Sequence, residues 1–535
     1  MRRLLSKTVL RRLTLIEALA RLNTWVPVEQ LIQLLNCTDK TLMKDVEIIN
    51  DEWEEYLQLD FSKRRGLAVR AGLTNKIKNV YQRVLRESSE FQFLERIFFE
   101  PDKDAEYWIN ELFISETSFY RMVRQITKSL KTYGLQLERK PFCVTAADER
   151  WVRLFYQSYF EEAYGGGEWP FAIEERDMYC YVMRSSTDFD VMQDDRELIQ
   201  HAYLLMITCI RANQGFLLDQ TIYAEPEDVL DQVIRMSENY MQSLLAETGY
   251  ELTEYWYREV SRGVFYEFYN WDNPQQEIRI QNAVDTFLDK LIAGVEFDLP
   301  EEDRKKISQR MMHWYLAYTI YPYNRVILRN ESESSARNIR RLYPIFSKLV
   351  EVNLKEIETD CNFPWAQIRE DDILCLLLKD WSDLPRQLEM LRRQVTVLII
   401  SDRGLKHSRM LRGIIKGQLL DKVVVDIFKS SVLFITPTEL ECFHDYDIVV
   451  ANNPVPDYQD ENLLLVDNFM SEGDWNLLHQ RIIRKQKQMS DAYIHDLDIN
   501  LLKSGREIYP HRKKAANIAT FVMEEDHPSE GFFRL

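Results

Sequence analysis

The sequence has few cysteines, and none of them follows a metal-binding or disulfide pattern. Seven cysteines are scattered over 535 residues, and no two have the C-x-x-C spacing. Closely paired cysteines are expected of structural zinc sites, and a dense cysteine framework is expected of small secreted domains. We therefore expect these cysteines to be small apolar core residues in a reducing cytoplasm. We expect no metal site and no cofactor.

Long apolar runs and catalytic motifs are also lacking. No apolar stretch is long enough to cross a bilayer, and Arg11 and Arg12 interrupt any signal-peptide core near Met1. No phosphate-binding loop ending in Gly-Lys-Ser/Thr, no H-E-x-x-H and no G-x-S-x-G occurs. The triglycine 165–167 is followed by Glu-Trp-Pro and matches no phosphate loop. The sequence predicts a cytoplasmic protein that is not an enzyme and has no membrane partner.

Positive charge is scarce overall but unevenly distributed. The net charge is −18, yet residues 1–150 hold 25 lysines and arginines against 22 acidic residues. The acidity is therefore concentrated in the rest of the chain, where it discourages indiscriminate binding to nucleic acid. The amino-terminal part remains compatible with a specific nucleic-acid partner.

Two copies of one helix–turn–helix pattern occupy residues 28–53 and 105–130. In each copy a helix N-cap, Thr38 or Ser115, precedes an apolar stripe with the spacing of a helix that is buried along one face. The two stripes are Leu42, Val46, Ile49, Trp53 and Phe119, Val123, Ile126, Leu130. The tripeptide Leu-Gln-Leu follows each stripe. Two such units near one end of a chain suggest a protein that reads two segments of DNA.

Each stripe leads into a predicted β-hairpin with a basic tip, so that residues 12–72 and 76–146 both read as winged helices. The tips are 62–66 and 138–141. With the stripes turned inward, basic and hydroxyl side chains face outward, where they could bind base edges or phosphates. The predicted DNA-contacting residues are Lys40, Lys44, Lys63, Arg64, Arg65, Thr117, Tyr120, Arg121, Arg124, Arg139 and Lys140. The alternative interpretation is a pair of ordinary helical hairpins with solvated charges.

The remainder of the chain changes character twice. Residues 174–390 are dominated by long helical patterns, among them 276–293, 301–320 and 335–356, with a break at 298–300. Val395–Ile400 is then a continuous β-branched and apolar run, as expected of a buried parallel strand. Further short strands alternate with helices up to about residue 486, which predicts a small α/β domain.

This order of parts resembles the Mga-type regulators of Gram-positive bacteria (M-protein trans-acting positive regulators). The resemblance covers residues 1 to about 490, and its clearest piece is 13–53 with the turn Asn36–Leu42. It implies a multidomain, mainly α-helical chain: winged helices at 1–74 and 75–165, two helical modules at 174–297 and 298–392, a IIB-like α/β domain at 393–490 and an extension at 491–535. The helical modules are similar to phosphotransferase-system regulation domains.

The resemblance also implies two phosphorylation candidates, His201 and His313, and a phosphocarrier protein as partner. They are the only histidines before residue 400, and one lies in each module, whereas the family pattern has two per module. Phosphate on such a residue adds nearly two negative charges that could reset a helix or a dimer contact. The alternative is a polar core or interface histidine. In the IIB-like domain the loop 401–404 lacks the cysteine that accepts the phosphate in active IIB proteins, so we expect this domain to serve association in a homodimer.

The sequence thus predicts a DNA-binding transcription activator that links sugar-phosphotransferase status to promoter activity, with double-stranded promoter DNA as partner. By resemblance its targets would be virulence or surface genes. Two alternatives stay open. One is a carbohydrate-operon regulator or antiterminator of the same modular class. The other is a helical scaffold without any nucleic-acid function.

Overall fold

The computed structural model describes residues 1–22, 24–70, 77–165, 168–172, 174, 195–218, 259, 271 and 273–496. The chain divides into two compact units, Met1–Asp272 with Tyr315–Asn330 and Asn273–Trp314 with Glu331–Leu535. Much of the predicted module 174–297, and most of the extension 491–535, lies outside the described residues. Within the described ranges the chain is mainly helical with one small parallel sheet, and none of their helices is both long enough and apolar enough to span a membrane.

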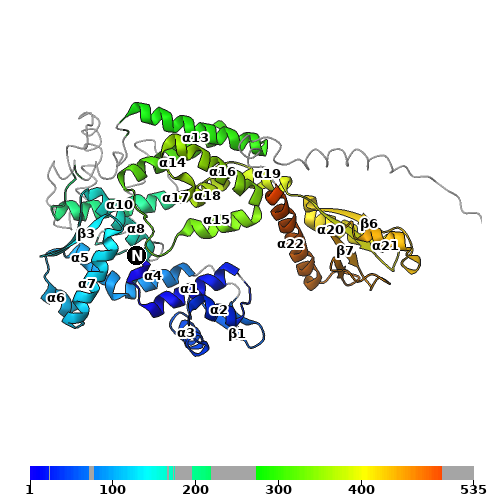
Figure 1. The fold of residues 1–535 in the computed structure, drawn as a ribbon, viewed down its shortest axis with the longest axis horizontal. Helices are drawn as coiled ribbons and strands as arrows, with labels where there is room; N and C mark the ends of the chain where they lie inside the picture. Colours follow the sequence, from blue (N-terminus) through cyan, green and yellow to red (C-terminus); the bar gives the residue numbers. More distant parts are fainter. Residues whose placement is uncertain are drawn as a thin grey trace, which may run out of the picture. The chain divides into compact units, whose positions relative to one another are not determined.

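The first winged helix is built from α1 (Lys7–Leu22), α2 (Val28–Leu35), α3 (Asp39–Glu52) and the hairpin β1 (Leu59–Ser62) and β2 (Gly66–Val69) (Figure 1). Helix α2 ends at Asn36 in the left-handed conformation, and the Thr38 hydroxyl then accepts the Thr41 N–H to cap α3. The predicted stripe of α3 is buried. A single antiparallel bridge joins Val26 to Leu67 of the hairpin.

The second winged helix repeats this plan with one more helix. It comprises α4 (Ile77–Glu87), α5 (Ser89–Phe99), α6 (Ala105–Glu111), α7 (Glu116–Lys131), β3 (Leu135–Arg139) and β4 (Phe142–Ala146). Its core is aromatic, because Phe93 contacts Trp108, Phe119 and Phe142 edge to face at centroid distances of 5.5–5.7 Å. All four stripe residues of α7 are fully buried, as predicted.

Two further helices and the segment 320–329 also belong to the first unit. Helix α8 (Glu149–Tyr164) packs on α4 and on α10 (Asp195–Asn213), and the buried side chains of all three join one continuous core with both winged helices. The segment 320–329 crosses the same unit. Its backbone N–H groups at Ile327, Leu328 and Arg329 donate to the Glu162 carboxylate at 2.6–3.1 Å.

The helices between residues 273 and 392 follow the predicted pattern with one exception. They are α13 (Pro274–Val295), α14 (Glu301–Ile320, whose last turn belongs to the first unit), α15 (Glu331–Leu342), α16 (Pro344–Cys361), α17 (Trp365–Ile368), α18 (Glu370–Asp380) and α19 (Leu384–Leu391). The predicted single helix over 335–356 is wrong. Tyr343 leaves the helical conformation and Pro344 starts a new helix, because proline lacks an N–H and restricts the residue before it.

The carboxyl-terminal domain is the predicted α/β fold. Its four parallel strands, β5 (Val395–Ile400), β6 (Val423–Ile427), β7 (Ile448–Ala451) and β8 (Leu463–Leu465), lie in the order β6-β5-β7-β8. Helices α20 (Leu405–Leu419) and α22 (Glu472–Asp496) pack on one face of the sheet. The short helix α21 (Pro437–Phe443) packs on the other face through Phe443 (Figure 1).

Candidate nucleic-acid interface

The outward face of α3 carries a balanced set of charges. Lys40 and Lys44 are exposed, as predicted, and so are the acidic residues Asp39 and Glu47 on the same helix. Because the four charges cancel, this helix contributes little net attraction to phosphate. Its two lysines can still form individual contacts with DNA.

An ion-pair anchor that sequence reasoning missed holds α3 in place. Asp45 is 2% exposed and accepts hydrogen bonds from the Arg11 Nε at 2.5 Å and the Arg12 Nε at 3.2 Å. The Asp45 hydrogen bond raises the pKa of Arg11. Asp45 lies beside the stripe residue Val46, but its partners are more than 30 positions away on α1, and no local pattern joins them. The anchor ties the recognition helix to the rest of its winged helix.

The first wing is strongly basic and rigidly held. Lys63, Arg64 and Arg65 are exposed at the tip between β1 and β2. The Arg65 guanidinium lies 4.4 Å from the centroid of the Trp25 ring, within cation–π distance. Gly66 follows with φ +94°, and a Cβ at that position would lie 1.9 Å from the Val26 carbonyl oxygen. Only glycine fits there, so the hairpin turns at a fixed point and presents three cations together.

The recognition helix α7 presents a more positive face than α3. Thr117, Tyr120, Arg121 and Arg124 are all exposed, as predicted, while the Ser115 hydroxyl caps the helix by accepting the Ser118 N–H. The set offers two guanidinium groups and two hydroxyls against one acidic neighbour, Glu116. Arginine pairs bidentately with guanine, and hydroxyls bond to several bases. The second wing adds the exposed Arg139 and Lys140.

The turn before α7 contains an exposed ring that the sequence analysis did not single out. Phe113 is 94% exposed and has φ +52°. In the first winged helix the corresponding turn residue is Asn36, with φ +48°. Asparagine tolerates the left-handed conformation, whereas for a bulky side chain it costs about 1–2 kcal/mol. Alignment of the two copies would have revealed the exchange, but not its exposure.

Comparison with known proteins agrees with this geometry. Residues 73–160 match the Mga helix-turn-helix domain, which corresponds to the second winged helix and most of α8. A trans-acting regulator of Streptococcus pneumoniae serotype 4 is 21% identical over 490 residues, or 88% of this chain and 96% of the relative. The chain is thus similar to the Mga-type regulators, in this domain and over most of its length. The matched domain is a helix–turn–helix, and the relative carries the name of a regulator.

Two regulators of Bacillus anthracis match shorter parts of this chain. The capsule synthesis positive regulator AcpA is 24% identical over 212 residues, 39% of this chain and 44% of AcpA. The anthrax toxin expression trans-acting positive regulator is 22% identical over 151 residues, 28% of this chain and 31% of the relative. All three relatives carry the names of regulators, which fits the expectation of a protein that acts by binding.

The two phosphorylation candidates lie in different surroundings. His201, on α10, is half-buried, between the half-buried Gln200 and the fully buried Ala202, and its Nδ1 is buried without a hydrogen-bond partner in the described part of the chain. Burial lowers its pKa, so the imidazole is neutral at pH 7. His313 is exposed on α14. A phosphate could be added at His313 without disturbing the core, whereas at His201 it would disturb the contact between α10 and α8.

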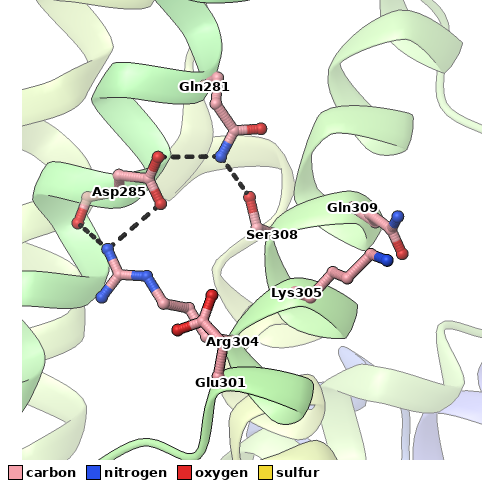
Figure 2. A pocket seen from close by; sticks show the side chains of 7 residues that line it. All are labelled: Gln281, Asp285, Glu301, Arg304, Lys305, Ser308 and Gln309. Carbon is pink, nitrogen blue, oxygen red and sulfur yellow. Dashed lines mark hydrogen bonds and ion pairs between the residues drawn. The ribbon is translucent and has the colours of Figure 1, made fainter.

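A polar hollow of about 530 Å³ lies between α13 and α14 (Figure 2). Its charges largely satisfy one another: Arg304 bonds to Asp285 at 3.2 Å and also to Asp289, and Gln281 donates to the Ser308 hydroxyl at 2.8 Å. Ligand pockets are usually lined by apolar side chains, and this one is lined by polar residues only. Across the described ranges, no cluster of three or more metal-ligating side chains occurs.

The loop after β5 carries a fixed negative charge in the carboxyl-terminal α/β domain. The Asp402 carboxylate accepts hydrogen bonds from the Asn452 and Asn453 amides, and these bonds lower its pKa. Beside it the Ser401 hydroxyl and His407 Nδ1 lie 2.8 Å apart, and His407 Nε2 lies 2.8 Å from the Asn468 carbonyl oxygen. Because Nε2 must donate to that carbonyl, Nδ1 accepts from Ser401. An ionised Asp402 would repel an incoming phosphate.

Proposed function

We propose that this regulator binds double-stranded promoter DNA through both winged helices and activates transcription, in the cytoplasm. The single observation that carries the proposal is the repeated geometry of a buried stripe beneath an exposed polar helix face, followed by a basic wing. The residues we assign to DNA are Lys40, Lys44, Lys63, Arg64, Arg65, Thr117, Tyr120, Arg121, Arg124, Arg139 and Lys140. The names of the relatives support a positive effect on transcription.

A binding assay at two ionic strengths tests this proposal directly. The full chain should retain a labelled promoter duplex on a filter, and retention should fall as salt rises, because each neutralised phosphate releases counterions. Arg64→Ala should flatten the slope of log affinity against log salt by about one unit on every sequence. Retention that is absent, or insensitive to salt, would favour the scaffold alternative.

We further propose that phosphorylation of a helical module controls the regulator, with His313 as the more accessible acceptor. Its exposure on α14 supports this choice over the half-buried His201. The phosphocarrier protein of the sugar phosphotransferase system would be the donor. After incubation with that protein and its kinase, mass spectrometry should find a phosphate that His313→Ala removes. A label that survives both His313→Ala and His201→Ala would end this part of the proposal.

The carboxyl-terminal domain would join two subunits rather than transfer phosphate. Repulsion between the ionised Asp402 carboxylate and an incoming phosphate supports the loss of phosphate transfer in this domain. The exposed apolar side chains of Leu433 and Phe434 support association between subunits. Sedimentation of the full chain should give the mass of a dimer. Leu433→Ser with Phe434→Ser should shift it toward the monomer, while Leu342→Ser, an exposed leucine of α15, should not.

A further inference from the structure

Phe113 has the most exposed large apolar side chain in the described part of the chain, at 94%. It lies in the turn between α6 and α7, two residues before the Ser115 N-cap. The next residue, Ile114, is half-buried and packs against the core of the winged helix, so the turn itself is anchored without the phenyl ring. The ring therefore makes no evident contribution to folding.

The backbone at Phe113 points to the same conclusion. The turn needs a left-handed residue, and the first winged helix meets that need with Asn36 at φ +48°. At φ +52° the second copy uses phenylalanine, which is poorly suited to this conformation. Since asparagine satisfies the same turn, the ring is not required by the local geometry. Strained, exposed side chains of this kind are concentrated at functional sites.

We propose that Phe113 contacts DNA and packs against the 5-methyl group of a thymine at the edge of the site that α7 reads. This inference rests on the proposed DNA-binding function. Recognition helices enter the major groove with their amino-terminal residues, so the turn that leads into α7 approaches the bases with it. Thr117, Tyr120 and Arg121 offer hydrogen bonds, and Phe113 supplies the apolar contact that the thymine methyl group accepts. The cationic Arg121 and Arg124 lie on α7, the helix that follows Phe113, and they favour DNA over a protein as the partner that contacts the ring.

The test uses the full chain and a 30-base-pair duplex that the wild type selects from a random library. Phe113→Asn copies the turn of the first winged helix, and Phe113→Gly is a second variant without strain; both should unfold at or above the wild-type temperature. Either variant should bind the selected duplex about tenfold more weakly. A scrambled duplex should be bound equally by all three proteins, with the same salt slope. Phe113→Leu, which keeps an apolar side chain, should retain most of the affinity.

Deoxyuridine scanning of the selected duplex identifies the contacted base. Replacing one particular thymine by deoxyuridine removes its methyl group and should weaken wild-type binding about fourfold, yet leave Phe113→Asn unaffected. Equal affinity of wild type and Phe113→Asn for the selected duplex would overturn the inference. So would uniform weakening on both duplexes, or unchanged DNA binding with reduced transcription in a reconstituted system, which would point to a protein partner. If the wild type selects no duplex at all, the proposed function fails before this inference is reached.

Discussion

The two winged helices share one fold but place their positive charge differently. The first has a balanced recognition helix, on which Lys40 and Lys44 are offset by acidic neighbours, and a wing with three cations. The second has two arginines on its recognition helix and a smaller basic wing. Wing cations suit phosphates, and helix arginines suit guanine edges. The comparison suggests that the first copy mainly supplies affinity and the second mainly supplies sequence preference.

The copies also differ in what holds the recognition helix. Asp45 of α3 is paired with arginines of α1, whereas its counterpart in α7 is the buried Met122. The second copy relies on an aromatic cluster around Phe93. It is also tied to the segment 320–329, because the Tyr321 hydroxyl donates to the Tyr133 carbonyl at 3.1 Å and the Tyr133 hydroxyl donates to the Val326 carbonyl at 2.9 Å. A conformational change that moved the segment 320–329 would therefore act directly on the second winged helix.

The largest losses of stability should appear when the cores of the two winged helices are truncated. Phe119→Ala removes a fully buried ring that contacts Phe93 and Phe142, and we expect it to lower the free energy of unfolding by about 4 kcal/mol. The matched Leu42→Ala in the first copy should cost about 3 kcal/mol. Urea unfolding followed by circular dichroism measures both. A larger loss for Leu42→Ala would show that the aromatic cluster does not distinguish the second copy.

Removal of the buried carboxylate should affect the first copy alone. Asp45→Ala leaves the partly buried Arg11 and Arg12 without their shared partner, and we expect a loss of about 3 kcal/mol, less if the arginines turn toward water. Asp51→Ala, at an exposed position of the same helix, should change the free energy of unfolding by less than about 0.5 kcal/mol. If both variants unfold like the wild type, the ion pair does not anchor α3.

Specificity should depend more on α7 than on α3. Arg121→Ala should weaken binding to a selected duplex by about 2 kcal/mol and relax the preference at one base pair. Lys44→Ala, at the corresponding position of α3, should weaken binding by less than about 1 kcal/mol on all sequences. Competition with single-base variants of the duplex separates these effects. Equal loss of specificity in the two variants would remove the proposed division between the copies.

The tie between α8 and the segment 320–329 should make stability depend on pH. Burial raises the pKa of Glu162 from 4.5 to about 7, although three backbone N–H groups partly oppose the shift. Between these values the folded state holds a proton that the unfolded state releases, so stability falls as pH rises from about 4.5 to about 7. The loss should be on the order of 3 kcal/mol.

Glu162→Gln isolates this contribution, since the amide oxygen can still accept an N–H of the segment but does not titrate. The variant should unfold with a flatter pH dependence between pH 5 and 7, in the window set by that pKa. Glu106→Gln, an exposed carboxylate of α6, serves as the control and should leave the wild-type profile unchanged. A wild-type stability that rises through this range would mean that Glu162 is not the dominant group.

Local periodicity explains why the recognition helices were predictable. The caps Thr38 and Ser115 and the stripes that follow them lie within single helices, so spacing alone assigned their buried and exposed faces. The strand β5 was predictable for the same reason, since six consecutive apolar or β-branched residues suit only a buried strand. Pro344 also indicated the break between α15 and α16, but the apolar residues on both sides of it have helical spacing and led to the prediction of one continuous helix.

The features that the sequence did not reveal all depend on contacts between distant segments. Asp45 pairs with residues of another helix, and Trp25 lies under Arg65 only because Val26 pairs with Leu67. The docking of Glu162 onto the backbone of 327–329 joins positions about 165 apart. Such contacts are set by tertiary packing, which no local pattern encodes.

The smallest effect should separate charge from position in the first wing. Trp25→Leu removes the ring that lies 4.4 Å from the Arg65 guanidinium but keeps all three wing cations. Because an exposed cation–π contact contributes about 0.5–1 kcal/mol, we expect DNA affinity to fall two- to fourfold with the salt slope unchanged. Arg65→Ala should lower the slope by about one unit as well. If Trp25→Leu also lowers the salt slope, the Trp25 ring positions other cations of the wing besides Arg65. The phosphate contacts of the first copy would then depend on this one tryptophan.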